Sequence, residues 1–209
     1  MAPDSTRVKE VVGYNNKLCD NVKYIFMTRN EAIAIMHVWV QSPGLRKHMH
    51  AVAAAMEHYA KQDGADADQW WIAGLLHDMD YEKYPVVGPQ GHPHQAVAFL
   101  REKGVNGEIL DAILGHASQV PRHTRMAQTL FAVDELCGFI VAVALIKPNK
   151  KMSDVDSASV MKRLKEKRFA ANVSREDIYQ GAEELGVSLE EHAAHVIAAL
   201  QAAADQLGL

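Results

Sequence analysis

Signals for the start of a helix recur along the chain, and they constrain the fold more than any other sequence feature. Thr28-Arg29-Asn30-Glu31 has the pattern of a capping box, and Ser42-Pro43 places a capping serine before a proline at the first helical position. Asn106, Ser174 and Ser188 offer further caps. No segment shows the alternation of apolar and polar residues that is typical of a strand. The sequence therefore predicts an all-α fold.

Hydrophobic periodicity and proline positions divide the chain into helices and loops. We expect helices over residues 28–39, 42–61, 66–79, 93–103, 106–117 and 124–145, and about three more between 148 and 209. Residues 84–93 are rich in proline and glycine, which predicts a loop. The predicted organisation is an irregular arm at 1–27, a helical domain at 28–147 and a helical extension at 148–209.

Charge and composition narrow the expected partners. The net charge of −4 gives no whole-chain attraction to nucleic acid or anionic lipid, so we expect a small-molecule partner. The N-terminus lacks the apolar region of a signal peptide, and the charge-free apolar run 136–146 is too short to span a bilayer. Cys19 and Cys137 are too few for a disulfide scaffold, and Cys137 is interpreted as a small buried hydrophobic residue. A cytoplasmic protein is expected.

Asp134 is a carboxylate in the middle of an apolar helical stripe. Its neighbours one and two turns away include Leu130, Phe131, Gly138 and Val141. A buried carboxylate needs a strong partner, which is either a metal ion or an ordinary ion pair. Gly138 leaves space beside Asp134, and this favours the ion.

His77 and Asp78 close the expected helix 66–79, which is apolar on every side and is therefore expected to be buried all round. Burying an ionised Asp78 there is costly unless it is paired or binds a cation. A salt bridge to Asp78, or capping of the helix by His77, are the alternatives that this dipeptide leaves open.

The chain has eleven histidines, and their helical positions separate them. On the helix 42–61, His48 lies about 60° from the centre of the apolar stripe, whereas His50 and His58 lie about 140° away. His48 can therefore reach an interior site, although a histidine at such a position can also be purely structural. We expect His50 and His58 to face water.

Two further histidine positions are candidates for the same interior site. His116 ends its helix on the apolar face, and either His92 or His94 can turn inward from the Gly/Pro-rich loop. Imidazole and carboxylate are suitable ligands for iron, manganese and zinc, and no thiolate favours a closed structural zinc site. This ligand chemistry predicts a metal site that stays open for catalysis.

The ordered set His48, His77-Asp78 and Asp134 resembles the signature of the HD-domain superfamily of metal-dependent phosphohydrolases. The resemblance covers about residues 40–146, although Met79-Asp80 departs from the common His-Asp-Ile-Gly wording. It implies an HD-like helical bundle in which His48, His77, Asp78 and Asp134 hold a first metal ion. His92 and His116 match the extra histidines of two-metal members, in which Asp78 would bridge the ions.

The resemblance implies a hydrolase in which metal-activated water attacks the phosphorus of a phosphate ester or nucleotide. The cofactor would be one or two divalent ions, such as Fe, Mn, Zn or Mg. The candidate catalytic carboxylates are Asp78, Asp80 and Glu82. The candidate phosphate-binding cations are Lys83, Lys147 and Lys150, with Lys151 and Arg122 also available.

Two other functions fit the same residues. Some HD-fold proteins with the fuller histidine set use a di-iron centre for oxygen-dependent cleavage, and others bind or sense a nucleotide without turnover. Asp80 is also compatible with an acid that supports a metal ligand without contacting the ion, or with a plain helix-end role, which we favour. The lysines are compatible with a solvated face. The sequence leaves the oligomeric state open and is compatible with a homo-oligomer.

Overall fold

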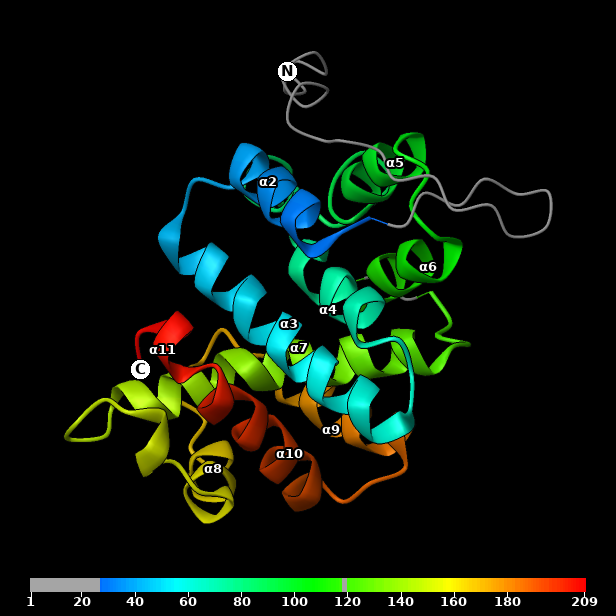
Figure 1. Cartoon of the computed structure of the whole chain (residues 1–209). Helices are drawn as coiled ribbons and strands as arrows, with labels where there is room; N and C mark the ends of the chain where they lie inside the picture. The colour runs from blue at the N-terminus through cyan, green and yellow to red at the C-terminus, as the bar shows by residue number, and fades with distance from the viewer. Residues whose placement is uncertain (1–26, 118–119) are drawn as a thin grey trace.

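The computed structural model describes residues 27–117 and 120–209, and within these ranges the chain is helical with no named strand (Figure 1). The predicted all-α fold is confirmed. In chain order the helices are α2 (Arg29–Trp39), α3 (Pro43–Asp63), α4 (Ala67–Leu76), α5 (His94–Glu102), α6 (Gly107–His116), α7 (Arg125–Leu145), the short 3₁₀ helix η1 (Met152–Asp154), α8 (Ser157–Leu164), α9 (Arg175–Leu185), α10 (Leu189–Ala202) and α11 (Ala204–Leu207).

Side-chain caps start most of these helices where the sequence predicts. The capping box between Thr28 and Glu31 opens α2, and Ser42 accepts a hydrogen bond from the backbone of Leu45 at the start of α3. Asn106, Ser174 and Ser188 cap α6, α9 and α10 in the same way. The three helices expected in the C-terminal segment correspond to α8, α9 and α10, and the short elements η1 and α11 form in addition.

Helix α4 ends at Leu76, three residues before the predicted end at residue 79. The ring of His77 donates a hydrogen bond to the carbonyl of Gly74, and Asp78 begins a run of turns in place of another helical turn. If the helix continued, the Gly74 carbonyl would instead accept a hydrogen bond from the backbone N–H of residue 78. The His-Asp pair therefore lies on a turn at the end of α4.

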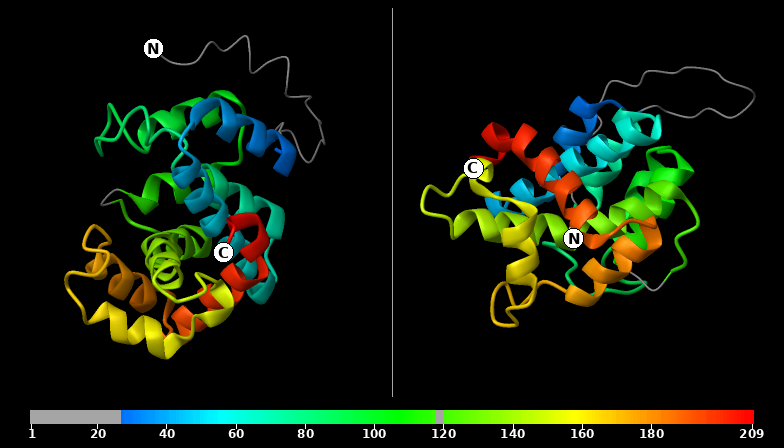
Figure 2. Two further views of the ribbon diagram at one scale, coloured as in Figure 1. Left: turned by 90° about the vertical axis from the view of Figure 1, so that its left-hand side faces the viewer. Right: turned by 90° about the horizontal axis from the view of Figure 1, so that it is seen from below.

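Helices α3 and α7 form the centre of the molecule. Helix α4 packs along α3, α6 packs on α4 and α7, and α9 and α10 cover the other sides of α7 and α3. Figures 1 and 2 show α2 and α5 on one side of this centre and α8, α9 and α10 on the other. The metal-site candidates on α3, α4, α6 and α7 are thereby brought towards one another.

Two glycines permit the closest of these helix contacts. A Cβ on Gly74 would lie 2.8 Å from Cα of Ala53, so α4 can approach α3 only with glycine at this position. A Cβ on Gly181 would lie 2.5 Å from Cα of Ala132, where α9 meets α7. The first approach sets the spacing between α3, which carries His48, and α4, which ends just before His77.

Helix α7 is long and apolar enough to cross a membrane by length and composition, and among the described residues it is the one helix that meets that test. In the fold it is a core helix, since 61% of its most apolar window is buried. Cys137 on this helix is a fully buried free thiol. The prediction for Cys137 is confirmed, whereas Cys19 lies outside the described residues.

One apolar core runs through both halves of the described chain, from Met27 and the α3 and α4 residues to Val196, Leu200 and Leu207. The predicted extension at 148–209 therefore packs on the same core as the helices before it. The proposed division at residue 147 stays a prediction. The predicted arm lies outside the described residues, except for Met27.

Candidate metal centre

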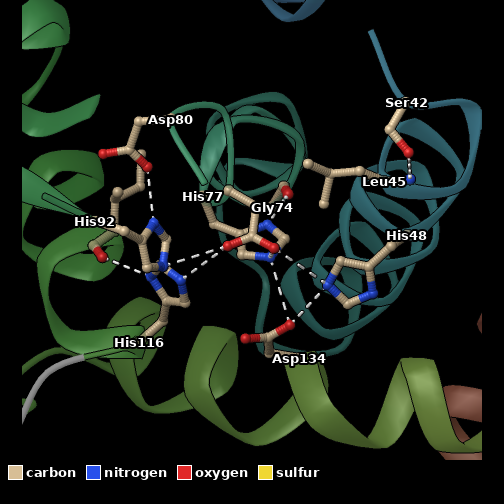
Figure 3. A network of polar contacts seen from close by, with 11 residues as sticks. Ser42, Leu45, His48, Gly74, His77, Asp80, His92, His116 and Asp134 are labelled. Atoms are coloured by element: carbon tan, nitrogen blue, oxygen red, sulfur yellow. Dashed lines mark hydrogen bonds and ion pairs between the residues drawn. The ribbon is translucent and has the colours of Figure 1, made fainter. Parts of the chain in front are cut away.

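Six predicted ligands come together in one place from separate elements of the chain. Figure 3 shows the rings of four histidines converging on the carboxylates between them. The six are His48 on α3, His77 and Asp78 after α4, His92 before α5, His116 at the end of α6 and Asp134 in the middle of α7. The sequence-based set is thus assembled by the fold, and His92 is the histidine of the 84–93 loop that turns inward.

Asp78 lies between two pairs of histidines, and each of its oxygens faces one pair. Its Oδ2 is 3.4 Å from Nε2 of His77 and 3.8 Å from Nε2 of His48. Its Oδ1 is 3.4 Å from Nε2 of His92 and 3.5 Å from Nε2 of His116. This arrangement offers two ion positions that share one carboxylate.

Asp134 completes the first of these positions. Its Oδ1 lies 2.9 Å from Nε2 of His48 and 3.4 Å from Nε2 of His77. The candidate ligand atoms fall into overlapping groups of three whose members all lie within 4.8 Å of one another. Four residues therefore surround the first position, and Asp78, His92 and His116 surround the second.

The ring orientation of the buried histidines leaves a lone pair directed at the carboxylates. Nδ1 of His77 donates to the Gly74 carbonyl at 2.7 Å, and Nδ1 of His116 donates to the Ile113 carbonyl at 2.6 Å. These bonds fix the proton on Nδ1, so Nε2 is free to ligate. Both Nε2 atoms are buried and make no hydrogen bond. A buried polar nitrogen without a hydrogen-bond partner destabilises a folded core, and coordination of metal ions would give both Nε2 atoms a partner.

His92 is held in the same manner by a carboxylate. Its Nδ1 is 2.7 Å from Oδ1 of Asp80, and the other oxygen of Asp80 accepts a hydrogen bond from the backbone N–H of Ala96 at 2.8 Å. The carboxylate of Asp80 is fully buried behind the imidazole. This geometry suits a role in orienting His92, and it does not suit the catalytic proton transfer that the sequence suggested for Asp80.

The charges in the centre are those of a cation site. Burial opposes charge on His77, but the carboxylates of Asp78 and Asp134 outweigh burial and raise its pKa well above the ordinary value. Burial likewise opposes ionisation of Asp78 and Asp134, yet the neighbouring histidines lower the pKa of both carboxyls. The carboxylates therefore stay ionised, and without metal the site takes up a proton that a divalent ion would displace.

A cavity of about 450 Å³ opens over the centre. Its wall includes four residues that the sequence did not single out, namely Tyr81, Phe131, Glu135 and Asp177. The ring of Tyr81 packs edge-on against His92 with 5.2 Å between centroids. Burial and the adjacent Asp134 raise the pKa of Glu135 to about 7. Asp177 comes from α9, so the C-terminal extension forms part of the wall.

Glu82 and the candidate phosphate-binding lysines lie outside this cavity. The carboxylate of Glu82 accepts hydrogen bonds from the backbone of Gln41 and Ser42, so it fixes the link before α3. The Nζ of Lys83 lies 4.7 Å from the centre of the Trp39 ring. Lys147 and Lys150 follow the far end of α7, because Leu145 is about 16 Å along the helix from Asp134.

The remaining predicted cation and histidines also have other partners. Arg122 makes a double hydrogen bond to Glu184 at 2.7 and 2.6 Å. It lines a neighbouring cavity that shares His116, Ala117, Phe131 and Asp177 with the cavity over the centre. His50 is bonded to Gln206, and His58 faces His195 and Gln62. Both are half-buried at the C-terminal helices, so the expectation that they face water is only partly met.

The fold and the site together define an all-helical protein with a buried His/Asp centre suited to one or two divalent ions. The family model of the HD domain matches residues 45–138, which span all six candidate ligands. Residues 45–138 are therefore similar to an HD domain. Comparison with curated proteins gives no match, and comparison with solved structures gives none either.

Proposed function

We propose that the protein is a metal-dependent hydrolase that acts on a small phosphate ester or nucleotide. The HD domain is typical of metal-dependent phosphohydrolases. The observation that carries the proposal is the Asp78 carboxylate, whose two oxygens each face a separate pair of histidines. This is the arrangement needed to hold two ions side by side at the floor of an open cavity.

Bound divalent ions would supply Lewis acidity for a phosphoryl oxygen and would lower the pKa of a water molecule so that hydroxide is available near neutral pH. The protein side chains keep this chemistry in place. Gly74, Ile113 and Asp80 fix the rings of His77, His116 and His92, so the ligand nitrogens need no rearrangement.

The charge of the cavity wall restricts the substrate. None of the described residues in the wall is Lys or Arg, whereas Asp177 adds a carboxylate to the two candidate ligand carboxylates. Glu135, whose pKa is raised to about 7, adds a further negative charge only when it is ionised. The ions would then be the main positive charges available to the substrate. We therefore favour a substrate with a single phosphoryl group over one with a polyphosphate chain.

The same observation supports an oxygen-dependent di-iron enzyme as the second candidate. Such a reaction does not need side-chain cations for a phosphate, and the six-residue ligand set accommodates two iron ions as readily as two ions of another metal. The choice between the two reactions depends on the metal and on the products.

The decisive experiment assays the metal-loaded protein against a broad panel of phosphomonoesters, phosphodiesters and nucleotides. We expect release of phosphate or of a phosphate ester with Mn²⁺, Zn²⁺, Mg²⁺ or Fe²⁺. Oxygen consumption by the iron-loaded protein, dependent on an added compound and without phosphate release, would favour the oxygenase. Tight nucleotide binding with neither reaction would favour a sensing module.

Matched variants connect any activity to the centre. Asp134→Ala should abolish turnover, because it removes a carboxylate that faces both His48 and His77. Asp111→Asn on the exposed face of α6 should leave turnover unchanged, because its side chain points away from the centre. Equal activity of both variants would assign the turnover to a contaminant or to another site.

A further inference from the structure

A second cavity lies next to the metal centre, between α3, α7 and the C-terminal end of the chain. Its volume is about 220 Å³, and Val141, Leu145, Leu207 and Leu209 contribute to its wall. Apart from Lys47 and His48, its described wall residues are aliphatic or glycine. Figure 1 shows the short α11, which carries Leu207, beside α3.

The two cavities share a boundary. His48 and Gly138 belong to the wall of the cavity over the metal centre and also to the wall of the apolar cavity. At Gly138 an added Cβ would find only Nδ1 of His48 within 4 Å, at 4.0 Å. The absence of a side chain at Gly138 therefore leaves room along α7 beside the ligand histidine.

The size and lining of the second cavity indicate what it can hold. Its volume is smaller than the roughly 300–1,000 Å³ that is typical of a complete ligand pocket, so it suits one part of a ligand. Aliphatic walls favour an aliphatic or small aromatic group over a charged one, because burying a charge there is costly. The adjoining cavity is polar and contains the candidate metal ligands.

We propose that the second cavity binds the apolar group of the substrate while the polar, reacting end lies at the metal centre. The substrate is then an amphipathic small molecule, for example a phosphate ester of an alkyl or aryl alcohol. This inference rests on the proposed metal-dependent reaction, since that reaction places the polar end. It also assigns the C-terminal residues Leu207 and Leu209 to the selection of substrate.

The test compares binding of n-hexylphosphonate and methylphosphonate to the metal-loaded protein by calorimetry. Neither probe is a phosphate ester, so binding is measured without turnover. We expect hexylphosphonate to bind at least about tenfold more tightly, because each methylene moved from water to apolar surroundings strengthens binding about fourfold. Equal affinities, or no detectable binding of hexylphosphonate, would overturn the proposal.

Variants at the cavity wall locate the effect. Val141→Phe and Leu145→Trp should reduce the ratio of the two affinities to about one by filling the cavity. Leu145 is 49% exposed, so a larger residue there does not disturb the core. Ile146→Trp is the matched control, because Ile146 is also 49% exposed but does not line the cavity. If both cavity variants kept the wild-type ratio of hexylphosphonate affinity to methylphosphonate affinity, the proposal would be contradicted.

Failure of this proposal is distinguishable from failure of the proposed function. A preference for hexylphosphonate in a protein that hydrolyses no phosphate ester would refute the hydrolase and keep the apolar subsite. Hydrolysis of phosphate esters without any preference for the longer chain would refute the subsite and keep the hydrolase.

Discussion

His77 and His192 are both fully buried, but their ring nitrogens are used differently. In His192, Nδ1 lies 2.6 Å from the hydroxyl of Tyr59 and Nε2 lies 2.9 Å from the carbonyl of Ala132. In His77, one nitrogen bonds to the Gly74 carbonyl and the other faces Asp78 and Asp134 without a hydrogen bond.

The two histidines differ in whether the folded core satisfies both ring nitrogens. Burial lowers the pKa of His192 to about 4, so it is neutral at pH 7 and both its nitrogens are satisfied by the fold. His77 keeps an unsatisfied nitrogen beside two ionised carboxylates, which a folded core tolerates only for a further partner. Burial alone therefore does not distinguish His77 from His192, whereas the hydrogen bonding of their ring nitrogens does.

The largest expected effect is the loss of metal in Asp78→Ala. Because Asp78 is the carboxylate shared by both ion positions, we expect the affinity for both ions to fall by more than about a hundredfold. Metal analysis after gel filtration measures this loss. His192→Gln is the control and should retain its metal. If Asp78→Ala kept its full metal content, the contrast between His77 as a candidate metal ligand and His192 as a structural histidine would lose its support.

The second prediction concerns pH and the stability of the His192 region. The pKa of His192 is about 4 in the folded protein and about 6.5 when unfolded, so the unfolded chain binds more protons between these values. Stability from this residue is complete above pH 6.5 and is lost as pH falls towards 4, by up to about 3 kcal/mol.

Urea unfolding at pH 4 to 7 in the presence of chelator measures this dependence. The comparison is between the wild type and His192→Gln, since both retain the titrating groups of the metal centre. We expect a smaller loss of unfolding free energy in the variant. Identical pH profiles would mean that His192 is not held neutral by the fold.

The third prediction separates Asp80 from Glu82. Asp80→Asn should lower affinity for the second ion by about 10–100-fold, because Asp80 orients His92. Glu82→Gln should leave metal affinity unchanged, because Glu82 accepts hydrogen bonds from the backbone of Gln41 and Ser42 and lies outside the cavity over the centre. Titration of the chelator-treated variants with Zn²⁺ compares their affinities. An equal loss of Zn²⁺ affinity in Asp80→Asn and Glu82→Gln would contradict the different roles given to Asp80 and Glu82.

The smallest expected effect is that of Tyr59→Phe. Removing the hydroxyl leaves Nδ1 of the buried His192 without its partner, which should destabilise the protein by about 1 to 3 kcal/mol. Metal affinity should not change, because His192 is not among the candidate ligands. Chemical unfolding of Tyr59→Phe measures the loss of stability, and Zn²⁺ titration of the same variant measures its metal affinity. A loss of metal binding would contradict the separation of the His192 region from the metal centre.

The sequence predicts the candidate ligands that lie on regular helices. Asp134 is identifiable because a single carboxylate interrupts an apolar stripe, and His116 because it continues an apolar face. The structure brings both into the centre. Helical periodicity is sufficient to predict the positions of Asp134 and His116, because on a regular helix the direction of each side chain follows from a rotation of about 100° per residue.

The sequence does not predict the roles of Asp80 and Glu82 or the approach of Asp177. Residues 77–83 form successive turns, so no single period fixes the direction of each side chain. Asp177 reaches the cavity through the packing of α9 on α7, which depends on contacts between distant segments. The choice between His92 and His94 likewise needs the hydrogen bond between His92 and Asp80.

Anomalous diffraction from crystals of the protein loaded with Mn²⁺ or Zn²⁺ tests directly whether the His/Asp centre holds two ions. We expect two peaks, one on each side of the Asp78 carboxylate, roughly 3.5–4 Å apart as in other two-metal sites. The first peak should lie among His48, His77 and Asp134, and the second beside His92 and His116. Absence of metal at both positions in fully loaded protein would contradict the central claim.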